Sequence, residues 1–514
     1  MKKQVVLLLC CLGFACSSSN NKQADSFANP VIPGDLADPC VIRIDETYYA
    51  TGTSSEWAPF YPVFTSTDLV NWTQTGHVFD KQPEWTLSSF WAPELYYHNN
   101  QVYCYYTARR KTDGVSYIGV ATAPTPADVF TDHGLLVEFG TEAIDAFVFE
   151  DDGQLYITWK AYGLDQRPVE LIGSMLSDDG LRLVGEPFSL MVDNANIGME
   201  GQYLFKKGDY YYILYSAHNC CGPTSDYDVY VARSKRFKGP YEIYEGNPVL
   251  HGGGDFMSCG HGTAVTTPDN RMFYLCHAYL PGDGFYMGRQ AILQEMFIGD
   301  DGWVYFQGGA QATIKHPMPF ANTVQHEVPP FEDYFKDSQL RKEWAWNYVS
   351  SEVNARIEKE KLLLSGNPGE NNLYGTALCL RSLAPRYMFE TEVSNKNSSS
   401  KGLTVYGDSK NLLAWVFVDN KLVLKTVHDG EVTLWKEMEI EEESVYLRIE
   451  VTNGCCCYCY WSRDKTGSAI EPVHTEVINC DGFIRWDRVA RPGLIHFGNP
   501  DEPAEFSFFR MTTL

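Results

Sequence analysis

The sequence of 514 residues lacks three features that would each define a class of protein. Helical periodicity is nearly absent, which excludes an all-α fold. After the N-terminus, no segment has the ~18 apolar residues that a membrane-spanning helix needs. Basic residues are outnumbered, with 41 Lys and Arg against 66 Asp and Glu and a net charge of −25. An acidic chain without a basic stripe argues against nucleic acid as a partner and favours a neutral substrate.

A metal-binding cysteine pattern is also missing. The sequence has 15 cysteines, but they do not combine with His at the spacings of zinc sites. Four of them lie between positions 455 and 459 in one strand-like stretch, where we expect buried free thiols rather than a disulfide framework. The adjacent Cys220 and Cys221 are candidates for a vicinal disulfide.

Residues 1–27 read as an export signal and a tether. Lys2 and Lys3 precede a short apolar run and then small residues, a pattern typical of a signal peptide and too short for a stable membrane span. The stretch around Cys16 resembles a bacterial lipobox with Cys16 as the lipidated residue. We therefore predict an exported protein, lipid-anchored in the bacterial envelope (periplasm or outer membrane), which touches the membrane only through its anchor. A plain secreted protein is the alternative.

What the sequence does contain is a fivefold repeat of a polar turn followed by a Tyr-rich strand. Aromatic residues make up 14% of the chain, which suits β-strands and also sugar-binding surfaces. The repeat spacing of roughly 50 to 60 residues leaves room for four short strands per copy. We predict an all-β protein whose residues 28–310 form a five-bladed β-propeller. The copies span residues 44–53, 98–108, 150–161, 206–217 and 267–278.

Polar or aromatic side chains stand at the head of each repeat, about ten to thirteen residues before the Tyr-rich strand. Equivalent positions on the inner strands of a propeller converge on its axis, so these side chains should meet in one funnel. A solvated turn would explain any one of them but not their shared position. The positions are Asp38, the stretch from Trp91 to Glu94, Asp145, Glu200 and His261.

Three carboxylates around one funnel suit the cleavage of a glycosidic bond. One protonated carboxyl donates to the leaving oxygen, while an ionised carboxylate activates water. Carboxyls on different blades should be separated by most of the channel, which favours the inverting geometry of roughly 6.5–9.5 Å. A third carboxylate would raise the pKa of the acid by repulsion between like charges.

The repeat motifs resemble those of glycoside hydrolase family 43, five-bladed propeller enzymes acting on arabinose- and xylose-containing glycans. The resemblance runs through "ADPCVIRIDETYYATGT", "FWAPELYY", "AIDAFVFEDDGQLYITW", "GMEGQYLFKKGDYYYILYSA", "GHGTAVTTPDNRMFYLCHAY" and "MGRQAILQ". It departs from the family at Gln202, where Pro is usual, and at the Cys220–Cys221 pair.

The resemblance implies a role for each matched residue. Asp38 corresponds to the general base, Glu200 to the general acid and Asp145 to the carboxylate that orients the acid and tunes its pKa. Arg289 matches an arginine that contacts sugar hydroxyls, and His261 matches a histidine near the axis that sometimes binds Ca²⁺ or water. No cofactor is required, although a structural Ca²⁺ on the axis is a further expectation. Trp91, from the aromatic residues around the funnel, is our candidate sugar platform.

The repeats stop after Gly308, and a Pro-containing linker over 311–330 leads to a second domain. Residues 331–514 alternate apolar and polar positions between polar turns, which predicts an antiparallel β-sandwich. This domain resembles the concanavalin-like domain of some family 43 members. Without an evident row of exposed aromatic residues, we expect it to pack against the propeller rather than to bind glycan.

These features predict an exo-acting, inverting hydrolase that releases terminal pentose from plant oligo- or polysaccharides. We place α-L-arabinofuranosidase first and β-xylosidase second. A catalytically inactive carbohydrate-binding propeller is the rival from another class. Five-bladed fructan hydrolases carry Asn-Asp-Pro and Arg-Asp-Pro motifs, and the sequence contains neither.

Overall fold

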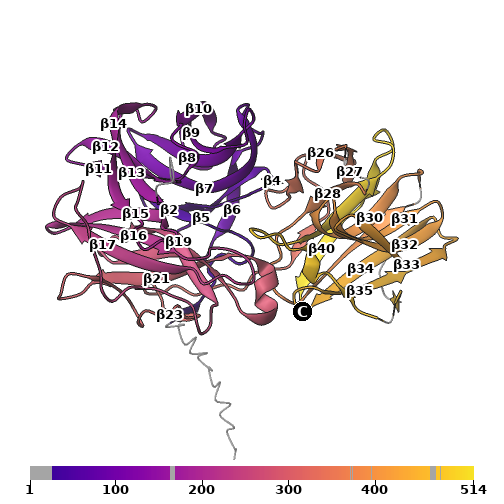
Figure 1. The fold of residues 1–514 in the computed structure, drawn as a ribbon. Helices are drawn as coiled ribbons and strands as arrows, with labels where there is room; N and C mark the ends of the chain where they lie inside the picture. The colour runs from indigo at the N-terminus through magenta and orange to yellow at the C-terminus, as the bar shows by residue number, and fades with distance from the viewer. Residues whose placement is uncertain are drawn as a thin grey trace, which may run out of the picture.

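The computed structural model describes residues 26–162, 168–370, 372, 374–394, 396–463, 470–474 and 476–514. Within these ranges the chain forms two β-rich domains that lie side by side (Figure 1). The predicted fold class, an all-β chain with a propeller followed by a sandwich, is confirmed. Cys16 and the predicted signal segment lie outside the described residues.

The N-terminal domain contains, among its described residues, five four-stranded antiparallel sheets. The first strand of each sheet contacts the first strands of two other sheets, so that the five strands close a ring around one axis. This ring is the arrangement that five repeats predict for a propeller. The five inner strands are β2 (Cys40–Ile44), β7 (Thr86–His98), β11 (Ala143–Asp151), β15 (Glu200–Lys207) and β19 (Ser258–Thr266).

Three further strands complete each sheet in chain order from the axis outwards. The Tyr-rich segments form the second strands, most of whose residues are buried along their length. A blade packs against neighbouring blades on both faces, so its strands are apolar on both sides rather than alternating. The outer strands are β3 (Thr47–Thr51), β5 (Phe60–Ser66) and β6 (Thr73–Phe79); β8 (Gln101–Arg110), β9 (Ser116–Ala123) and β10 (Thr131–Val137); β12 (Gln154–Ala161), β13 (Glu170–Leu176) and β14 (Leu183–Val192); β16 (Tyr210–Ala217), β17 (Asp228–Ser234) and β18 (Glu242–Ile243); β20 (Met272–Tyr279), β21 (Gln290–Ile298) and β22 (Val304–Phe306).

The start of the described chain is fastened to the fifth sheet. Strand β1 (Ser26–Ala28) pairs with β23 (Lys315–Pro317), which follows the fifth sheet. The side chain of Asn29 donates to the carbonyl of Leu293 at 3.0 Å and accepts from its amide at 2.8 Å. These bonds hold the segment that leads into the first sheet against the last sheet.

The C-terminal domain packs two antiparallel sheets face to face, as expected of a sandwich. Its core includes Trp344, Phe389, Trp415, Leu447 and Phe509. Short connections include η3 (Asp481–Phe483). One sheet contains β24 (Phe331–Asp333), β26 (Ser351–Glu358), β27 (Lys361–Pro368), β29 (Tyr387–Ser394), β34 (Ser444–Thr452), β35 (Cys456–Ser462), β36 (Glu471–Pro472), β37 (Ile478–Asn479), β39 (Ala504–Phe506) and β40 (Phe509–Thr513); the other contains β28 (Thr376–Cys379), β30 (Ser400–Asp408), β31 (Asn411–Val418), β32 (Lys421–His428), β33 (Glu431–Glu439) and β38 (Arg491–Phe497).

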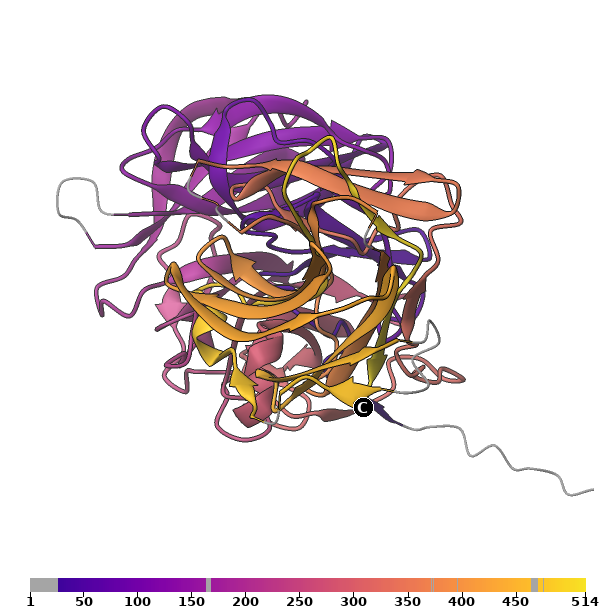
Figure 2. The same cartoon turned by 90° about the vertical axis from the view of Figure 1, so that its right-hand side faces the viewer.

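The two domains share a packed interface, which Figure 2 views from the sandwich side. Strand β4 (Trp57–Ala58) of the propeller pairs with β25 (Trp346–Asn347) of the sandwich. Trp57 is buried in an apolar cluster with Leu412, Ala414 and Val416 on the outer face of β31, and the guanidinium of Arg491 lies 4.2 Å from the centroid of its ring. The expectation that the sandwich packs on the propeller therefore agrees with this interface.

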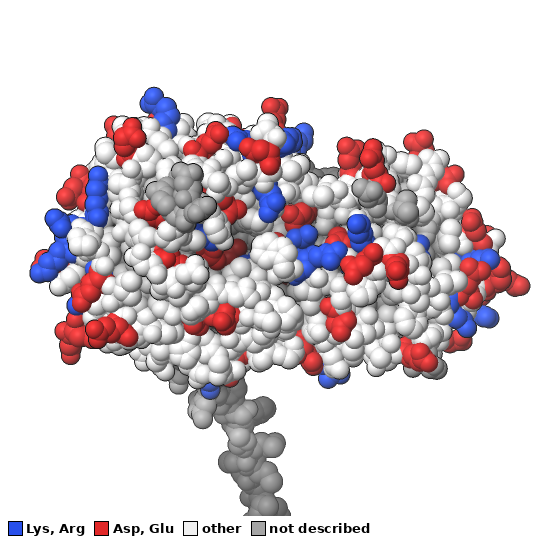
Figure 3. Space-filling model, in the orientation of Figure 1, with Lys and Arg blue, Asp and Glu red and all other residues white. Residues whose placement is uncertain are grey.

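Acidic side chains are spread over the face shown in Figure 3, and basic side chains lie among them in small groups. This distribution fits the net charge of −25. Among the described residues, no helix is both long and apolar enough to span a membrane.

Candidate active site

The inner strands share a distortion at the head of each repeat. Asp38, Ala92, Asp145 and His261 have φ between 38° and 58°, and Gly201 has φ of 59°. Bulges interrupt four of the five inner-strand ladders close to these residues. Left-handed backbone is unfavourable for non-glycine residues, and a bulge re-aims a side chain. The distortion therefore turns these residues toward the axis.

This backbone pattern corrects the predicted alignment by one residue. In the fourth sheet Gly201, not Glu200, is the equivalent of Asp38 and Asp145. Glu200 precedes the left-handed residue, as Trp91 precedes Ala92 in the second sheet. The acid candidate thus enters the funnel from a different repeat position than the two aspartates.

All six predicted site residues nevertheless line one pocket of 250 Å³. Loops from the propeller and the segment 486–487 of the sandwich contribute to the same wall. The lining residues are Asp38, Trp91, Arg109, Glu142, Ile144, Asp145, Lys160, Tyr162, Glu200, Cys220, Cys221, His261, Arg289, Trp486 and Asp487.

Asp38 is a buried carboxylate held in its ionised form. Its Oδ1 lies 3.2 Å from Nη1 of Arg289, and its Oδ2 accepts from the hydroxyl of Thr53 at 2.6 Å. Burial would raise the pKa of Asp38, but the charge of Arg289, followed by that of His261, holds it well below the usual range. A carboxylate that stays ionised suits the role of a general base.

Two histidines flank Asp38 in different ways. His277 is fully buried, and burial lowers its pKa to about 4, so the ring is neutral at pH 7. Its Nδ1 lies 3.1 Å from the backbone nitrogen of Asp38 and accepts that N–H. Nδ1 of His261 lies 3.4 Å from Asp38 Oδ1 and 3.9 Å from Asp145 Oδ2, so this ring bridges the first and third sheets.

Glu200 is paired with a cation that the sequence analysis did not identify. Nζ of Lys160, on β12, donates to Oε2 of Glu200 at 2.6 Å, and the hydroxyl of Tyr227 donates to Oε1 at 2.8 Å. Burial would raise the pKa of Glu200, but Lys160, and after it Tyr227, lower it below the ordinary value. The repulsion from Asp145 that we predicted to raise the pKa of Glu200 is therefore outweighed in the free site by the nearer cation.

Asp145 carries the raised pKa instead. Burial raises its pKa to about 6, with a further contribution from the charge of Glu200 and opposition from His261. Its Oδ2 accepts from the backbone N–H of Gly201 at 3.1 Å. Below about pH 6 Asp145 therefore carries the proton of this carboxylate pair, whereas at pH 7 both carboxyls are mostly ionised.

Two residues that line the pocket each keep one unpaired donor. Among the described side chains, Nε of Arg289 and Nε1 of Trp91 are buried without a hydrogen-bond partner. Buried donors are costly to leave unpaired, and both nitrogens are shielded from the pocket space by their surroundings.

The sandwich supplies residues that sequence reasoning missed. Trp486 remains 59% exposed although it lines the pocket, and its ring meets Trp91 edge-to-face at 5.9 Å. The carbonyl of Asp487 accepts from Nη2 of Arg289 at 3.1 Å, and its carboxylate accepts from Ser55 at 2.9 Å. The segment "FIRWDR" carries a Trp between charged residues, but its position at the funnel depends on domain packing.

The Ca²⁺ expected on the axis stays a prediction, because calcium sites also use backbone carbonyls and waters. Calcium needs six to eight oxygen ligands, and no cluster of three or more His, Cys, Asp or Glu with metal-binding geometry occurs among the described residues. His261 and Arg289 already face the carboxylate of Asp38, so a divalent cation there would meet a guanidinium.

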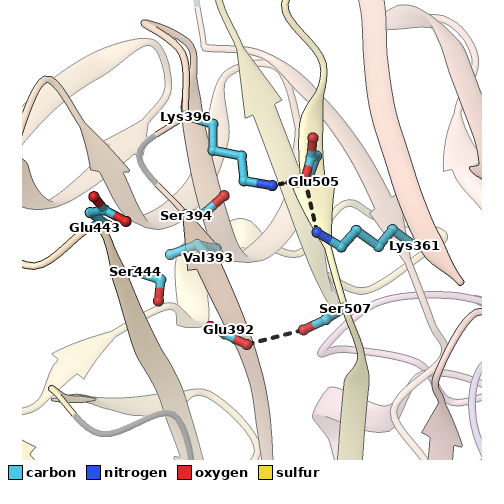
Figure 4. Close-up of a pocket in the computed structure, with 9 residues that line it drawn as sticks. All are labelled: Lys361, Glu392, Val393, Ser394, Lys396, Glu443, Ser444, Glu505 and Ser507. Carbon is cyan, nitrogen blue, oxygen red and sulfur yellow. Dashed lines mark hydrogen bonds and ion pairs between the residues drawn. The ribbon is translucent and has the colours of Figure 1, made fainter. Parts of the chain in front are cut away.

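A larger cavity of 510 Å³ lies on the sandwich (Figure 4). Its lysines, Lys361 and Lys396, both pair with Glu505, and Ser507 donates to Glu392. Aromatic platforms and the three candidate catalytic carboxylates are absent from its lining residues. Volume alone therefore does not select the active site.

Comparison with known proteins assigns both domains. The family described as Glycosyl hydrolases family 43 matches residues 27–304, more than half of the chain. The chain belongs to glycosyl hydrolase family 43. Residues 332–512 match the Beta xylosidase C-terminal Concanavalin A-like domain. The protein is thus a glycosidase that hydrolyses O-glycosyl bonds of xylosides or arabinofuranosides in oligo- or polysaccharides, and enzymes of this family need no cofactor.

Relatives with both pentose activities resemble this family 43 chain. A beta-xylosidase of Bacillus subtilis is 23% identical over 94% of this chain and 98% of the relative. A non-reducing end alpha-L-arabinofuranosidase of Bacteroides ovatus is 27% identical over 88% of each chain. The solved xylan beta-1,4-xylosidase of Bacillus halodurans superposes with a TM-score of 0.80 at 22% identity, covering 95% of this chain and all of that one. The solved structure supports the fold.

Proposed function

We propose that the protein is an exo-acting, inverting α-L-arabinofuranosidase. The observation that carries this proposal is the convergence of Asp38, Asp145 and Glu200, from three different sheets, on one 250 Å³ pocket. The arabinofuranosidase relative of Bacteroides ovatus, 27% identical over 88% of each chain, supports arabinose as the first choice.

Asp38 takes the role of general base in this proposal. Its carboxylate is ionised and positioned by Arg289 and Thr53, so it can accept a proton from a water that attacks the anomeric carbon. In an inverting enzyme the water stands between base and sugar. Arg289 thus holds Asp38 through Nη1 while its Nη2 is itself held by the carbonyl of Asp487.

Glu200 takes the role of general acid, and the leaving oxygen needs a proton from it. In the free site Lys160 keeps Glu200 ionised, and Asp145 holds a proton only below about pH 6. A sugar oxygen that enters beside Oε2 competes for the Lys160 ammonium, which weakens the ion pair and favours proton transfer to Glu200. Asp145 orients the acid, and its negative charge repels that of Glu200, which favours the protonated acid once the ion pair is weakened.

The shape of the pocket supports exo action. At 250 Å³ it is smaller than the roughly 300–1,000 Å³ of sites for drug-sized ligands. Trp486 and Asp487 close one side, where an endo-acting enzyme would need an open groove. The C-terminal domain therefore helps to restrict the site to chain ends.

β-Xylosidase is the second candidate, favoured by two specific observations. Residues 332–512 match a domain described from beta-xylosidases, and the Bacillus subtilis beta-xylosidase aligns over 94% of the chain. The alternative of an inactive binding propeller is disfavoured, because all three carboxylates line the pocket.

We also propose that the mature protein is exported and lipid-anchored through Cys16. The support is the basic start, the short apolar run and the small residues before Cys16. Labelling with radioactive palmitate in a bacterial host, with Cys16→Ser as the control, should show label in the wild type alone.

Hydrolysis of a panel of p-nitrophenyl pentosides and hexosides tests the activity. We expect the α-L-arabinofuranoside to be cleaved fastest, and proton NMR of the first sugar released should show the inverted anomer. Faster cleavage of the β-xyloside would select the second candidate. Retention of configuration would contradict the assignment of Asp38 as a base.

A further inference from the structure

The loop between β16 and β17 carries a disulfide that the reaction outlined above does not use. Cys220 and Cys221 are bonded to each other, and both line the pocket that contains Glu200. Ten other cysteines among the described residues are free thiols. The oxidised pair is therefore confined to the pocket wall.

The loop that bears the disulfide is held by hydrogen bonds on both sides. The hydroxyl of Ser225 donates to the carbonyls of Asn219 and Cys220 at 3.0 and 3.1 Å. The N–H of Gly222 donates to the hydroxyl of Tyr279 at 3.2 Å. Together these bonds fix the peptide groups on each side of the disulfide.

The same loop connects two parts of the site. At its C-terminal end Tyr227 donates to Glu200 at 2.8 Å. At its tip a Cβ added to Gly222 would lie 3.6 Å from the carbonyl of Trp486, so the loop meets the sandwich segment. A change in the tip would therefore alter the wall between Glu200 and Trp486.

We propose that the Cys220–Cys221 disulfide is a substrate-binding element that contacts the C–H face of the bound sugar. Its surface is apolar, polarizable and without hydrogen-bond donors, which suits ring carbons rather than hydroxyls. The bond also locks the two residues in one conformation, so binding orders less of the loop. The inference rests on the proposed function of this pocket.

Reduction of the wild-type enzyme tests this role without a substitution. Dithiothreitol supplies two electrons and two protons, so the S–S bond breaks, two thiols form and the reagent becomes a cyclic disulfide. Alkylation followed by peptide mass spectrometry reports whether Cys220 and Cys221 carry the label. We expect label only after reduction, and an increase of about two- to tenfold in KM for the pentoside with a smaller change in kcat.

The Cys220→Ser/Cys221→Ser variant should have the raised KM and no response to dithiothreitol. Cys456→Ser, which removes a partly exposed free thiol of the sandwich, should behave as the wild type in both states. Labelling of the untreated wild type at Cys220 and Cys221, or reduction that leaves KM unchanged, would overturn the inference.

Binding to an inactive variant separates this inference from the proposed activity. Calorimetric titration of Glu200→Gln with arabino- and xylo-oligosaccharides should give a dissociation constant that rises about two- to tenfold on reduction. If the wild type cleaves no pentoside but this shift is present, the proposed activity fails and the binding element stands. If pentosides are cleaved and the shift is absent, only the binding element fails. If neither sugar binds in either state, both are wrong.

Discussion

Lys160 decides the charge of the acid candidate at the level of single residues. Its ammonium is buried between Glu200, at 2.6 Å from Oε2, and the ring of Tyr162, at 4.3 Å from the centroid. Burial would lower the pKa of Lys160, but the charge of Glu200 raises it, so the side chain stays a cation. A buried pair of this kind is expensive to break by removing one partner.

The variant Lys160→Met should shift the alkaline limb of the kcat/KM profile upward. Loss of an opposite charge within hydrogen-bond distance raises a carboxyl pKa by about 1–3 units, and the alkaline limb reports the acid in the free enzyme. The control is Lys206→Met, whose ion pair with Asp151 lies outside the pocket. An unchanged profile in Lys160→Met would show that this lysine does not control the acid.

Asp145 links stability to pH. A carboxyl whose folded pKa is raised from 3.8 to about 6 destabilises the fold above pH 4, and the full cost is reached above about pH 6. Asp145→Asn removes that cost, so it should stabilise the protein by up to about 3 kcal/mol at pH 8 and have little effect at pH 4. Thermal unfolding at the two pH values measures the difference.

A buried carboxyl of the same channel provides the control for Asp145→Asn. Burial raises the pKa of Glu94 to about 8, and Glu94 does not line the pocket. Glu94→Gln should also stabilise the fold at pH 8 but keep activity, whereas Asp145→Asn should lose it. Activity retained in Asp145→Asn would refute the proposed role of Asp145 in orienting and protonating the acid.

At the scale of elements, the bulged strand β15 sets the position of the acid. Gly201 has φ of 59°, and an added Cβ would lie 2.7 Å from Cγ of His261. Gly208, in the turn after the same strand, has φ of 60° and open space around the position of a Cβ. The two glycines thus share a backbone conformation and differ in their surroundings.

Substitution of the two glycines by Ala separates backbone strain from a clash in the site. Both variants should lose about 1–2 kcal/mol of stability from the left-handed backbone. Only Gly201→Ala should also lose activity, because His261 must move away from Asp38 and Asp145. Chemical denaturation and pentoside hydrolysis measure the two effects, and equal activities would contradict the role given to His261.

The repeat pattern made the inner strands and the three carboxylates predictable from sequence. Asp38 and Asp145 stand at equivalent positions, so one alignment finds both. Glu200 lies one residue before the equivalent position, and the alignment by spacing still finds it because the shift is so small. The bulge that displaces it leaves no sequence signal beyond Gly201. Lys160 and Tyr227 were missed because their approach to Glu200 is set by packing between strands.

At the scale of the whole molecule, the active site belongs to both domains. Trp486 and Asp487 reach the funnel from the sandwich, and the pairing of β4 with β25 fixes that approach. Sequence analysis predicted that the sandwich packs on the propeller and narrows the mouth of the funnel, but it did not identify Trp486 and Asp487 as the residues that do so. Residues this far apart in the sequence come into contact only after both domains have folded and packed together, so no sequence pattern marks the contact.

Trp486→Ala should raise KM for oligosaccharides by about tenfold with a smaller effect on kcat. A large aromatic side chain at the pocket edge contributes contact area to binding rather than to the chemical step. Tyr334→Ala, at an exposed aromatic residue outside the pocket, is the control. Steady-state kinetics on arabino- and xylo-oligosaccharides measure the difference. If both variants matched the wild type, the binding role of Trp486 would be contradicted.

The bond from Arg289 to the carbonyl of Asp487 constrains how such a protein can diversify. Because the arginine that anchors the base is itself held by backbone of the other domain, recombination that replaced one domain alone would disturb turnover. Natural or engineered chimaeras that exchange the sandwich domain should therefore keep the original 484–489 loop with the propeller. New substrate specificities in such proteins would then arise while the propeller and the sandwich domain are inherited together, rather than by exchange of one domain alone.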